Sequence, residues 1–201
     1  MKQVLYFGMA VLAAVTMSFS PNPGPGYKVG DTARDFNLKN VDGKMYSLAG
    51  IPDAKGYIVV FTCNHCPFAK AYESRIIELH KKYAAQGFPV VAINSNDAAS
   101  EPTDSYENMQ KRSREKHYPF AYLYDDTQDI AKAYGARRTP HVFVLDKDRV
   151  VRYIGAIDDN SEEPSAVKEK YVENAVDALL AGKPVATPET KAIGCTIKWK
   201  A

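Results

Sequence analysis

The fold is decided by the stretch Phe61-Thr62-Cys63-Asn64-His65-Cys66-Pro67-Phe68. It ends an apolar run at 57–61 that is typical of a buried strand, and it leads into an amphipathic helix. Apolar residues recur along that helix at intervals of four, four, three and four, at Phe68, Tyr72, Ile76, Leu79 and Tyr83. Because two thiols lie two residues apart at this strand-to-helix junction, the sequence predicts a redox-active dithiol.

Strands and helices alternate on both sides of this junction. The expected elements are a hairpin of 35–38 and 45–48 around Asp42-Gly43, strands at 57–61, 88–93, 120–124, 141–145 and 150–154, and helices starting at Phe68 and spanning about 105–116, 127–134 and 166–181. The strand, helix and strand from 57 to 93 predict a right-handed βαβ unit with a parallel pair. Asp104 is expected to cap the second helix, with Glu107 at the capping-box position.

Length and composition indicate one globular domain. With 201 residues, of which 45% are hydrophobic and 25% charged, the chain can bury a sizeable core. The formal net charge of +2 is close to neutral, and no basic patch interleaved with aromatic residues stands out. Nucleic acid is therefore not an expected partner, and no cofactor is expected.

The first twenty residues differ in composition from the rest. Lys2 is their only charge, and residues 4–19 are nearly all apolar or small. Small residues at Ser18 and Ser20 complete the pattern of a secretory signal peptide. An uncleaved membrane anchor is the alternative, since the run approaches the length that a bilayer needs. Either interpretation predicts an exported protein that acts in the periplasm or elsewhere outside the cytoplasm.

Three further segments follow along the chain. Residues 21–26, Pro-Asn-Pro-Gly-Pro-Gly, have the composition of a linker. We expect the folded domain at 27–185 and a C-terminal tail at 186–201 that contains Cys195.

The motifs in this order resemble the thioredoxin-like superfamily, in the branch shared by TlpA/ResA-type thiol-disulfide proteins and AhpC/TSA redoxins. The resemblance covers residues 27–182, and it is carried by Val29–Leu38 with Asp42-Gly43-Lys44, Cys63-Asn64-His65-Cys66-Pro67, Tyr134-Gly135-Ala136 through Thr139-Pro140, and the closing hairpin at 142–155. It implies an α/β fold: a thioredoxin-like three-layer α/β/α sandwich with a mixed central sheet, an N-terminal β-hairpin and an inserted αβ unit.

The position of the dithiol assigns roles to its residues. At the start of a helix, unpaired backbone N–H groups and the helix dipole favour a thiolate, so Cys63 is the expected nucleophile with a lowered pKa. Cys66, one turn along, would resolve the mixed disulfide. His65 would stabilise the Cys63 thiolate as an imidazolium, or it is simply a polar residue at an exposed turn, as Asn64 would be.

The resemblance also places a cis-proline loop opposite the dithiol. It implies a cis Thr139-Pro140 bond, with the Thr139 backbone placed to pair with a bound peptide and Pro140 forming the wall of the site. Arg137 and Arg138 precede this loop and would add positive potential near the thiols, unless they are only solvated surface charges.

One departure from the thioredoxin pattern concerns proton transfer. Many thioredoxins carry a buried acid six residues before the first cysteine, where this chain has Tyr57. Glu73, Asp53 or water could take over as the proton acceptor, and the sequence does not choose among them.

A third cysteine lies in the tail. Ile193, Cys195, Ile197 and Trp199 alternate with glycine or polar residues, which predicts a docked strand with Cys195 and Trp199 facing inward. Cys195 is either a third redox thiol that reaches the Cys63–Cys66 pair or a buried, inert thiol that anchors the tail.

Three classes of function fit these observations. The first is a thiol-disulfide oxidoreductase that acts on protein disulfides with an unidentified redox donor. The second is a thiol-dependent peroxidase, but Gly56 and Val60 stand where the peroxiredoxin signature has proline and threonine. The third and weakest is a non-enzymatic metal-binding protein, which would use Cys63, Cys66 and either His65 or Cys195. Only one CxxC is present, with no second pair at zinc-site spacing, so no metal site is expected.

Overall fold

The computed structural model describes residues 26–201. The predicted signal peptide or anchor, and all of the predicted linker except Gly26, lie outside this range. Within residues 26–201, no helix has the length and apolar character needed to cross a membrane.

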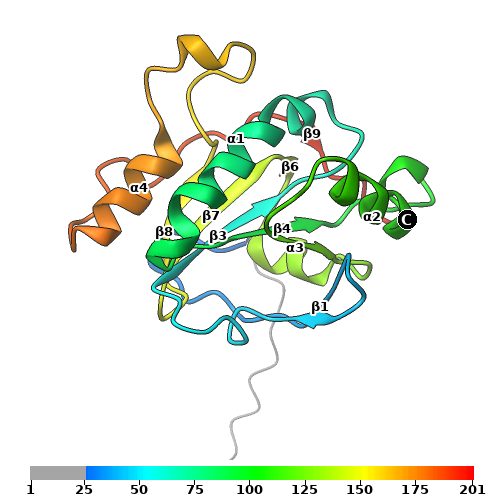
Figure 1. Ribbon diagram of the computed structural model, residues 1–201, viewed down its shortest axis with the longest axis horizontal. Coiled ribbons are helices and arrows are strands. Elements are labelled where there is room, and N and C mark those ends of the chain that lie inside the picture. Colours follow the sequence, from blue (N-terminus) through cyan, green and yellow to red (C-terminus); the bar gives the residue numbers. More distant parts are fainter. Residues whose placement is uncertain (1–25) are drawn as a thin grey trace, which may run out of the picture.

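A seven-stranded mixed sheet forms the centre of the molecule (Figure 1). Its order is β2-β1-β5-β4-β3-β7-β8, with β3 parallel to β4, β4 parallel to β5, and the other neighbours antiparallel. The strands are β1 (Leu38–Asn40), β2 (Met45–Tyr46), β3 (Gly56–Phe61), β4 (Val90–Asn94), β5 (Ala121–Tyr124), β7 (His141–Asp146) and β8 (Val151–Gly155). The N-terminal hairpin and the parallel βαβ unit are therefore confirmed.

Helices cover both faces of this sheet. On one face lie α1 (Pro67–Tyr83) and α4 (Tyr171–Leu180), with α2 (Tyr106–Glu115) joining the same cluster through Met109. On the other face lies α3 (Asp129–Tyr134), together with residues before β1. The predicted three-layer thioredoxin-like architecture is confirmed.

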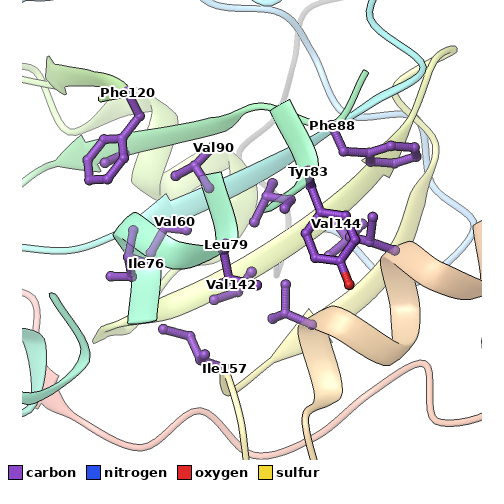
Figure 2. Close-up of a cluster of buried hydrophobic side chains, with 14 of the residues drawn as sticks. Val60, Ile76, Leu79, Tyr83, Phe88, Val90, Phe120, Val142, Val144 and Ile157 are labelled. Atoms are coloured by element: carbon purple, nitrogen blue, oxygen red, sulfur yellow. The ribbon is translucent and has the colours of Figure 1, made fainter. Parts of the chain in front are cut away.

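Strand β3 separates the two halves of the core. Ile58 and Val60 point into the cluster under α1, and Val59 and Phe61 point into the cluster under α3. Every residue of β3 is buried, as expected for a central strand with helices on both faces. Figure 2 shows Ile76 and Leu79 of α1 among the strand residues of the first cluster. Full burial of each such side chain contributes about 1.5–3 kcal/mol.

Two helix starts differ from the prediction. Helix α4 begins at Tyr171 instead of about residue 166, because Pro164–Ala166 form a short 3-10 helix that ends before it. Helix α2 is capped by Ser105, whose hydroxyl accepts from the Asn108 N–H, so the cap predicted at Asp104 is wrong. Asp104 instead ends the 3-10 helix Pro102–Asp104, with its side chain fully buried.

The tail is docked, but its inward face is shorter than predicted. Strand β9 (Cys195–Thr196) pairs with β6 (Arg138–Thr139) in a separate two-stranded sheet. Ile197 is buried, whereas Trp199 is 41% exposed, so the prediction that Trp199 faces inward is wrong. The β pairing ends at Thr196, and the alternation of inward and outward residues does not continue to residue 199.

Gly56, at the start of β3, provides a test of the packing. A Cβ at this position would overlap the Phe88 ring and the Leu145 carbonyl oxygen. We expect Gly56→Ala to lower the free energy of unfolding by about 1–3 kcal/mol through overpacking, measured by urea denaturation. Gly50→Ala is the control, because its nearest neighbour would be the Ser47 Oγ at 3.2 Å. Equal denaturation midpoints for the two variants would contradict this packing argument.

Candidate dithiol active site

The register of the sheet brings the dithiol to the cis-proline loop. Phe61, the last residue of β3, pairs with His141, the first residue of β7. Cys63 follows Phe61 by two residues, and Pro140 immediately precedes His141. The Thr139-Pro140 bond is cis, as the resemblance implied.

Thr139 contacts both sulfurs of the motif. Its Oγ1 lies 3.2 Å from the Cys63 Sγ, so the thiol can donate to the hydroxyl, and a thiolate can accept from it. Its carbonyl oxygen lies 3.3 Å from the Cys66 Sγ, a contact to which only a reduced Cys66 thiol can donate a hydrogen bond. Thr139 therefore contacts the sulfur atoms of both cysteines in the motif.

The structure pairs Cys66 with the tail cysteine. A disulfide joins Cys66 to Cys195 across 129 residues of sequence, with a Cα–Cα distance of 6.0 Å. Cys63 remains a free thiol and is 4% exposed, and Cys66 is fully buried. Cys195 is therefore neither a free thiol nor fully buried, but it does anchor the tail, and its redox role stays a prediction.

A buried carboxylate, Asp104, holds the turn between the two cysteines. Its Oδ1 accepts from the backbone N–H groups of Asn64 and His65. Its Oδ2 lies 2.6 Å from the His65 Nδ1 and accepts from the Asn96 Nδ2 at 2.7 Å. A buried carboxylate is stable only when its oxygens are satisfied in this way.

Asn64 is part of the same network and is not an exposed turn residue. It is buried, its Nδ2 donates to the Thr103 carbonyl at 2.9 Å, and its Oδ1 accepts from the Tyr122 hydroxyl at 3.0 Å. The turn of the motif is therefore held by the 3-10 helix Pro102–Asp104 and by β5.

The pKa of Cys63 is shifted in the direction opposite to the prediction from the sequence. Burial, and then the charge of Asp104, raise the pKa of this thiol to about 11. The Thr139 hydroxyl and the backbone N–H groups of Cys66 and His65 favour the thiolate, as predicted for a helix start, but they do not outweigh these two causes. The predicted low pKa is wrong for this state, in which Cys66 is bonded to Cys195.

His65 lies between the acid and the thiol. Its Nδ1 is 3.6 Å from the Cys63 Sγ and 2.6 Å from the Asp104 Oδ2. The shorter contact commits this nitrogen to the carboxylate, so much of any positive charge on the ring is offset by Asp104 before it acts on the sulfur. The predicted tuning of Cys63 by His65 therefore has to work through the His65–Asp104 pair.

The other proposed proton acceptors lie elsewhere. Glu73 accepts from the Tyr118 hydroxyl at 2.7 Å and pairs with Arg112 at 2.6 Å. Asp53 is exposed in a turn before β3. Tyr57 is buried in the cluster under α3. Asp104 is the carboxylate beside the Cys63 thiol, and no sequence pattern points to it because its position matches a helix cap.

The two arginines before the loop have different roles. The Arg138 Nη1 donates to the Gly194 carbonyl at 2.8 Å, which ties it to the tail. The backbone carbonyl of Arg137 accepts from the Ile197 N–H at 3.2 Å. Next to the loop, burial and the charge of Arg137 lower the pKa of His141 to about 4, so this ring is neutral.

The Cys63, His65 and Asp104 ligand atoms lie within 4.8 Å of one another, which resembles a metal site. However, two ligands of a tetrahedral ion bound at about 2 Å would be about 3.3 Å apart. The His65–Asp104 distance of 2.6 Å is that of a hydrogen bond. Cys66, which the metal-binding alternative needed, is bonded to Cys195.

The alkylation of Cys63 tests this electrostatic environment. In the oxidised protein, the rate with iodoacetamide should rise with pH to a midpoint well above the ordinary cysteine value of about 8.5. Asp104→Asn should move this midpoint down, because it removes the carboxylate charge that raises the pKa of Cys63. Glu107→Gln removes an equal charge from an exposed position on α2 and should leave the midpoint in place. A wild-type midpoint near 8.5 would contradict the assignment.

Comparison with known proteins gives the family. The model of the AhpC/TSA family matches residues 29–154. Thiol-disulfide oxidoreductase ResA of Geobacillus thermodenitrificans (strain NG80-2) is 28% identical over 126 residues, covering 63% of this chain and 68% of that protein.

Two solved structures resemble nearly the whole chain. An uncharacterized conserved protein from Geobacillus kaustophilus is 42% identical, with a TM-score of 0.81 over 86% of this chain and 93% of that one. A hypothetical protein from Sinorhizobium meliloti 1021 is 38% identical, with a TM-score of 0.80 over 88% of this chain and 97% of that one. The chain belongs to the AhpC/TSA family and is a thioredoxin-fold oxidoreductase.

Proposed function

We propose that this oxidoreductase exchanges disulfides with protein substrates through Cys63 and Cys66. The observation that carries the proposal is the contact of both sulfurs with Thr139, beside the cis-proline and at the start of α1. The similarity to a protein named thiol-disulfide oxidoreductase supports the same chemistry.

The exchange runs through two substitutions at sulfur. The Cys63 thiolate attacks one sulfur of the substrate disulfide, the other substrate sulfur leaves as a thiolate, and a mixed disulfide forms. The Cys66 thiolate then attacks the Cys63 Sγ and releases the second substrate thiolate. The substrate has gained two electrons, and the enzyme holds a Cys63–Cys66 disulfide.

The His65–Asp104 pair is our candidate for the group that accepts the Cys63 proton. In the tautomer that carries its proton on Nε2, the His65 Nδ1 has a free lone pair, and a small movement from Asp104 toward the sulfur, 3.6 Å away, would let it accept the Cys63 proton. Asp104 would hold the ring and offset its charge once it is protonated. This pair would replace the buried acid that other thioredoxins carry at the position of Tyr57.

The backbone of β6 is the candidate binding edge for the substrate. An extended peptide that pairs with Thr139 would place its own cysteine beside the dithiol, and main-chain hydrogen bonds would supply affinity without demanding a sequence. Thr139 and Pro140 would then bind substrate through backbone geometry.

We also propose that the protein acts outside the cytoplasm. The composition of residues 1–20 supports export.

The peroxidase alternative gains no support from the site. Gly56 and Val60 replace the proline and threonine of the peroxiredoxin signature. Turnover of hydrogen peroxide with dithiothreitol should therefore stay near the background rate. Rapid, Cys63-dependent turnover would favour the peroxidase instead.

Trapping the mixed disulfide tests the proposed roles. The double variant Cys66→Ser/Cys195→Ser lacks both other thiols, so it should accumulate a reducible adduct between Cys63 and a disulfide protein such as insulin. Cys63→Ser/Cys195→Ser is the matched control and should form no adduct. In a turbidity assay of insulin reduction, Cys63→Ser should lose at least tenfold in rate. An unchanged rate in that variant would refute the assignment of Cys63 as the nucleophile.

The reduction potential of the Cys195→Ser variant tests the direction of exchange. A thiolate that its surroundings disfavour makes the disulfide harder to reduce, so we expect a potential nearer to the thioredoxin value of about −270 mV than to about −120 mV. Equilibration with glutathione and quantification of the thiols would measure it. A potential near −120 mV would indicate an oxidant.

A further inference from the structure

The C-terminal tail lies on the edge that we assign to the substrate. In strand β9, Cys195 is paired with Thr139, and Thr196 is paired with Arg138, in antiparallel register. This is the arrangement expected of an extended peptide bound at the cis-proline loop. The protein thus supplies its own strand, with its own cysteine, at the position of a substrate.

Polar contacts seat the tail on both sides of Cys195. Before it, the Gly194 carbonyl accepts from the Arg138 guanidinium. After it, the Lys198 N–H donates to the Asn96 Oδ1 at 2.8 Å, and the Lys198 carbonyl accepts from the Gln128 Nε2 at 2.8 Å. Asn96 also donates to Asp104, so one side chain contacts both the tail and the acid of the site.

Gly194 brings the tail directly against the loop. A Cβ at this position would overlap the Thr139 carbonyl oxygen and would lie 3.1 Å from the Pro140 nitrogen. Only glycine therefore permits this close approach, which carries the Cys195 sulfur to Cys66.

With the tail bound along β6, the three cysteine sulfurs differ in their availability for disulfide exchange. Cys66 is bonded to Cys195 and fully buried, and Cys63 is a thiol with 4% exposure. Cys195 is the least buried of the three cysteines. A substrate peptide cannot pair with Thr139 while β9 occupies that edge.

We propose that Cys195 is a third redox residue. It replaces Cys63 as the disulfide partner of Cys66, and it is the residue that the reducing donor attacks. This inference rests on the proposed function. After a substrate has been reduced, the Cys195 thiolate attacks the Cys66 Sγ, the Cys63–Cys66 bond breaks, and the Cys66–Cys195 bond forms. Cys63 leaves as a thiolate and takes up a proton, which balances the one that Cys195 lost. The step moves the disulfide within the chain and consumes no oxidant.

Reduction then begins at the tail. A donor thiolate attacks the Cys195 Sγ, the accessible end of the disulfide, and Cys66 leaves as a thiolate. A second donor thiol releases Cys195, and two electrons have entered the chain. Substrate and donor therefore meet different sulfurs, Cys63 for the substrate and Cys195 for the donor.

Peptide mapping distinguishes the two disulfides directly. Trypsin cleavage after Lys55, Lys70, Lys191 and Lys198 leaves Cys63 and Cys66 together in peptide 56–70 and Cys195 in peptide 192–198. Wild-type protein is oxidised with a disulfide substrate, quenched in acid, alkylated and digested. We expect the two peptides linked, with alkylated Cys63, in at least tenfold excess over an internal Cys63–Cys66 disulfide. The reverse ratio would overturn the inference.

The order of events provides a second test. When reduced enzyme meets oxidised insulin in rapid-quench experiments, the internal disulfide should form first and then convert to the linked peptides. Appearance of the linked peptides without any Cys63–Cys66 intermediate would overturn the relay. Loss of the Cys63–insulin adduct in the trapping variant would instead overturn the proposed function, so the two failures differ.

Variants of the tail test the entry of the donor. With glutathione as the reductant, oxidised Cys195→Ser should be reduced at least tenfold more slowly than wild type, and Gly194→Ala should shift the disulfide toward Cys63–Cys66. Thr196→Ser changes an exposed neighbour on the same strand and should match wild type. Equal reduction rates for Cys195→Ser and Thr196→Ser would refute entry at Cys195.

Discussion

The site depends on one buried carboxylate. Asp104 receives two backbone N–H groups from the turn of the motif, the imidazole of His65 and the amide of Asn96. These contacts compensate the cost of burying its charge, and in return they fix the conformation in which Cys63 faces Thr139. Burial, and then the same charge, raise the pKa of Cys63. Asp104 thus positions the nucleophile and also holds it in the protonated form, so reactivity requires a change in its surroundings.

Thr139 joins the dithiol, the loop and the tail. Its hydroxyl and its carbonyl oxygen face the two sulfurs of the motif, and its residue pair in β9 is Cys195. The sheet produces this convergence, because the β3–β7 register delivers the end of one strand and the start of the other to the same place. A strand that binds along β6 therefore presents its side chain to the sulfurs, whichever chain it comes from.

The sequence was sufficient for the parts of the molecule that local patterns determine. Apolar periodicity located the strands and α1, and the resemblance supplied the cis Thr139-Pro140 bond. The sequence was not sufficient where the structure depends on contacts between distant residues. Asp104 and Ser105 are adjacent, and both are residue types that commonly cap a helix. Only the fold shows that Ser105 caps α2 while Asp104 turns inward to the motif. The partner of Cys66 was equally inaccessible, since Cys195 is 129 residues away. Trp199 is exposed because the period-two alternation holds only where β9 is paired.

In our proposal, the Cys66–Cys195 disulfide couples the position of the tail to the redox state of the dithiol. Individually, the hydrogen bonds that seat the tail contribute only about 0.5–1.5 kcal/mol each. A tethered strand nevertheless competes with a substrate at a high effective concentration, and the disulfide makes its occupancy complete. When Cys66–Cys195 is reduced, the tail keeps only its weak contacts, and the fraction of molecules with a free β6 edge rises. The electrons that return Cys66 to its thiol form therefore also open the edge on which the next substrate binds, so that an oxidised molecule does not hold a substrate that it cannot reduce.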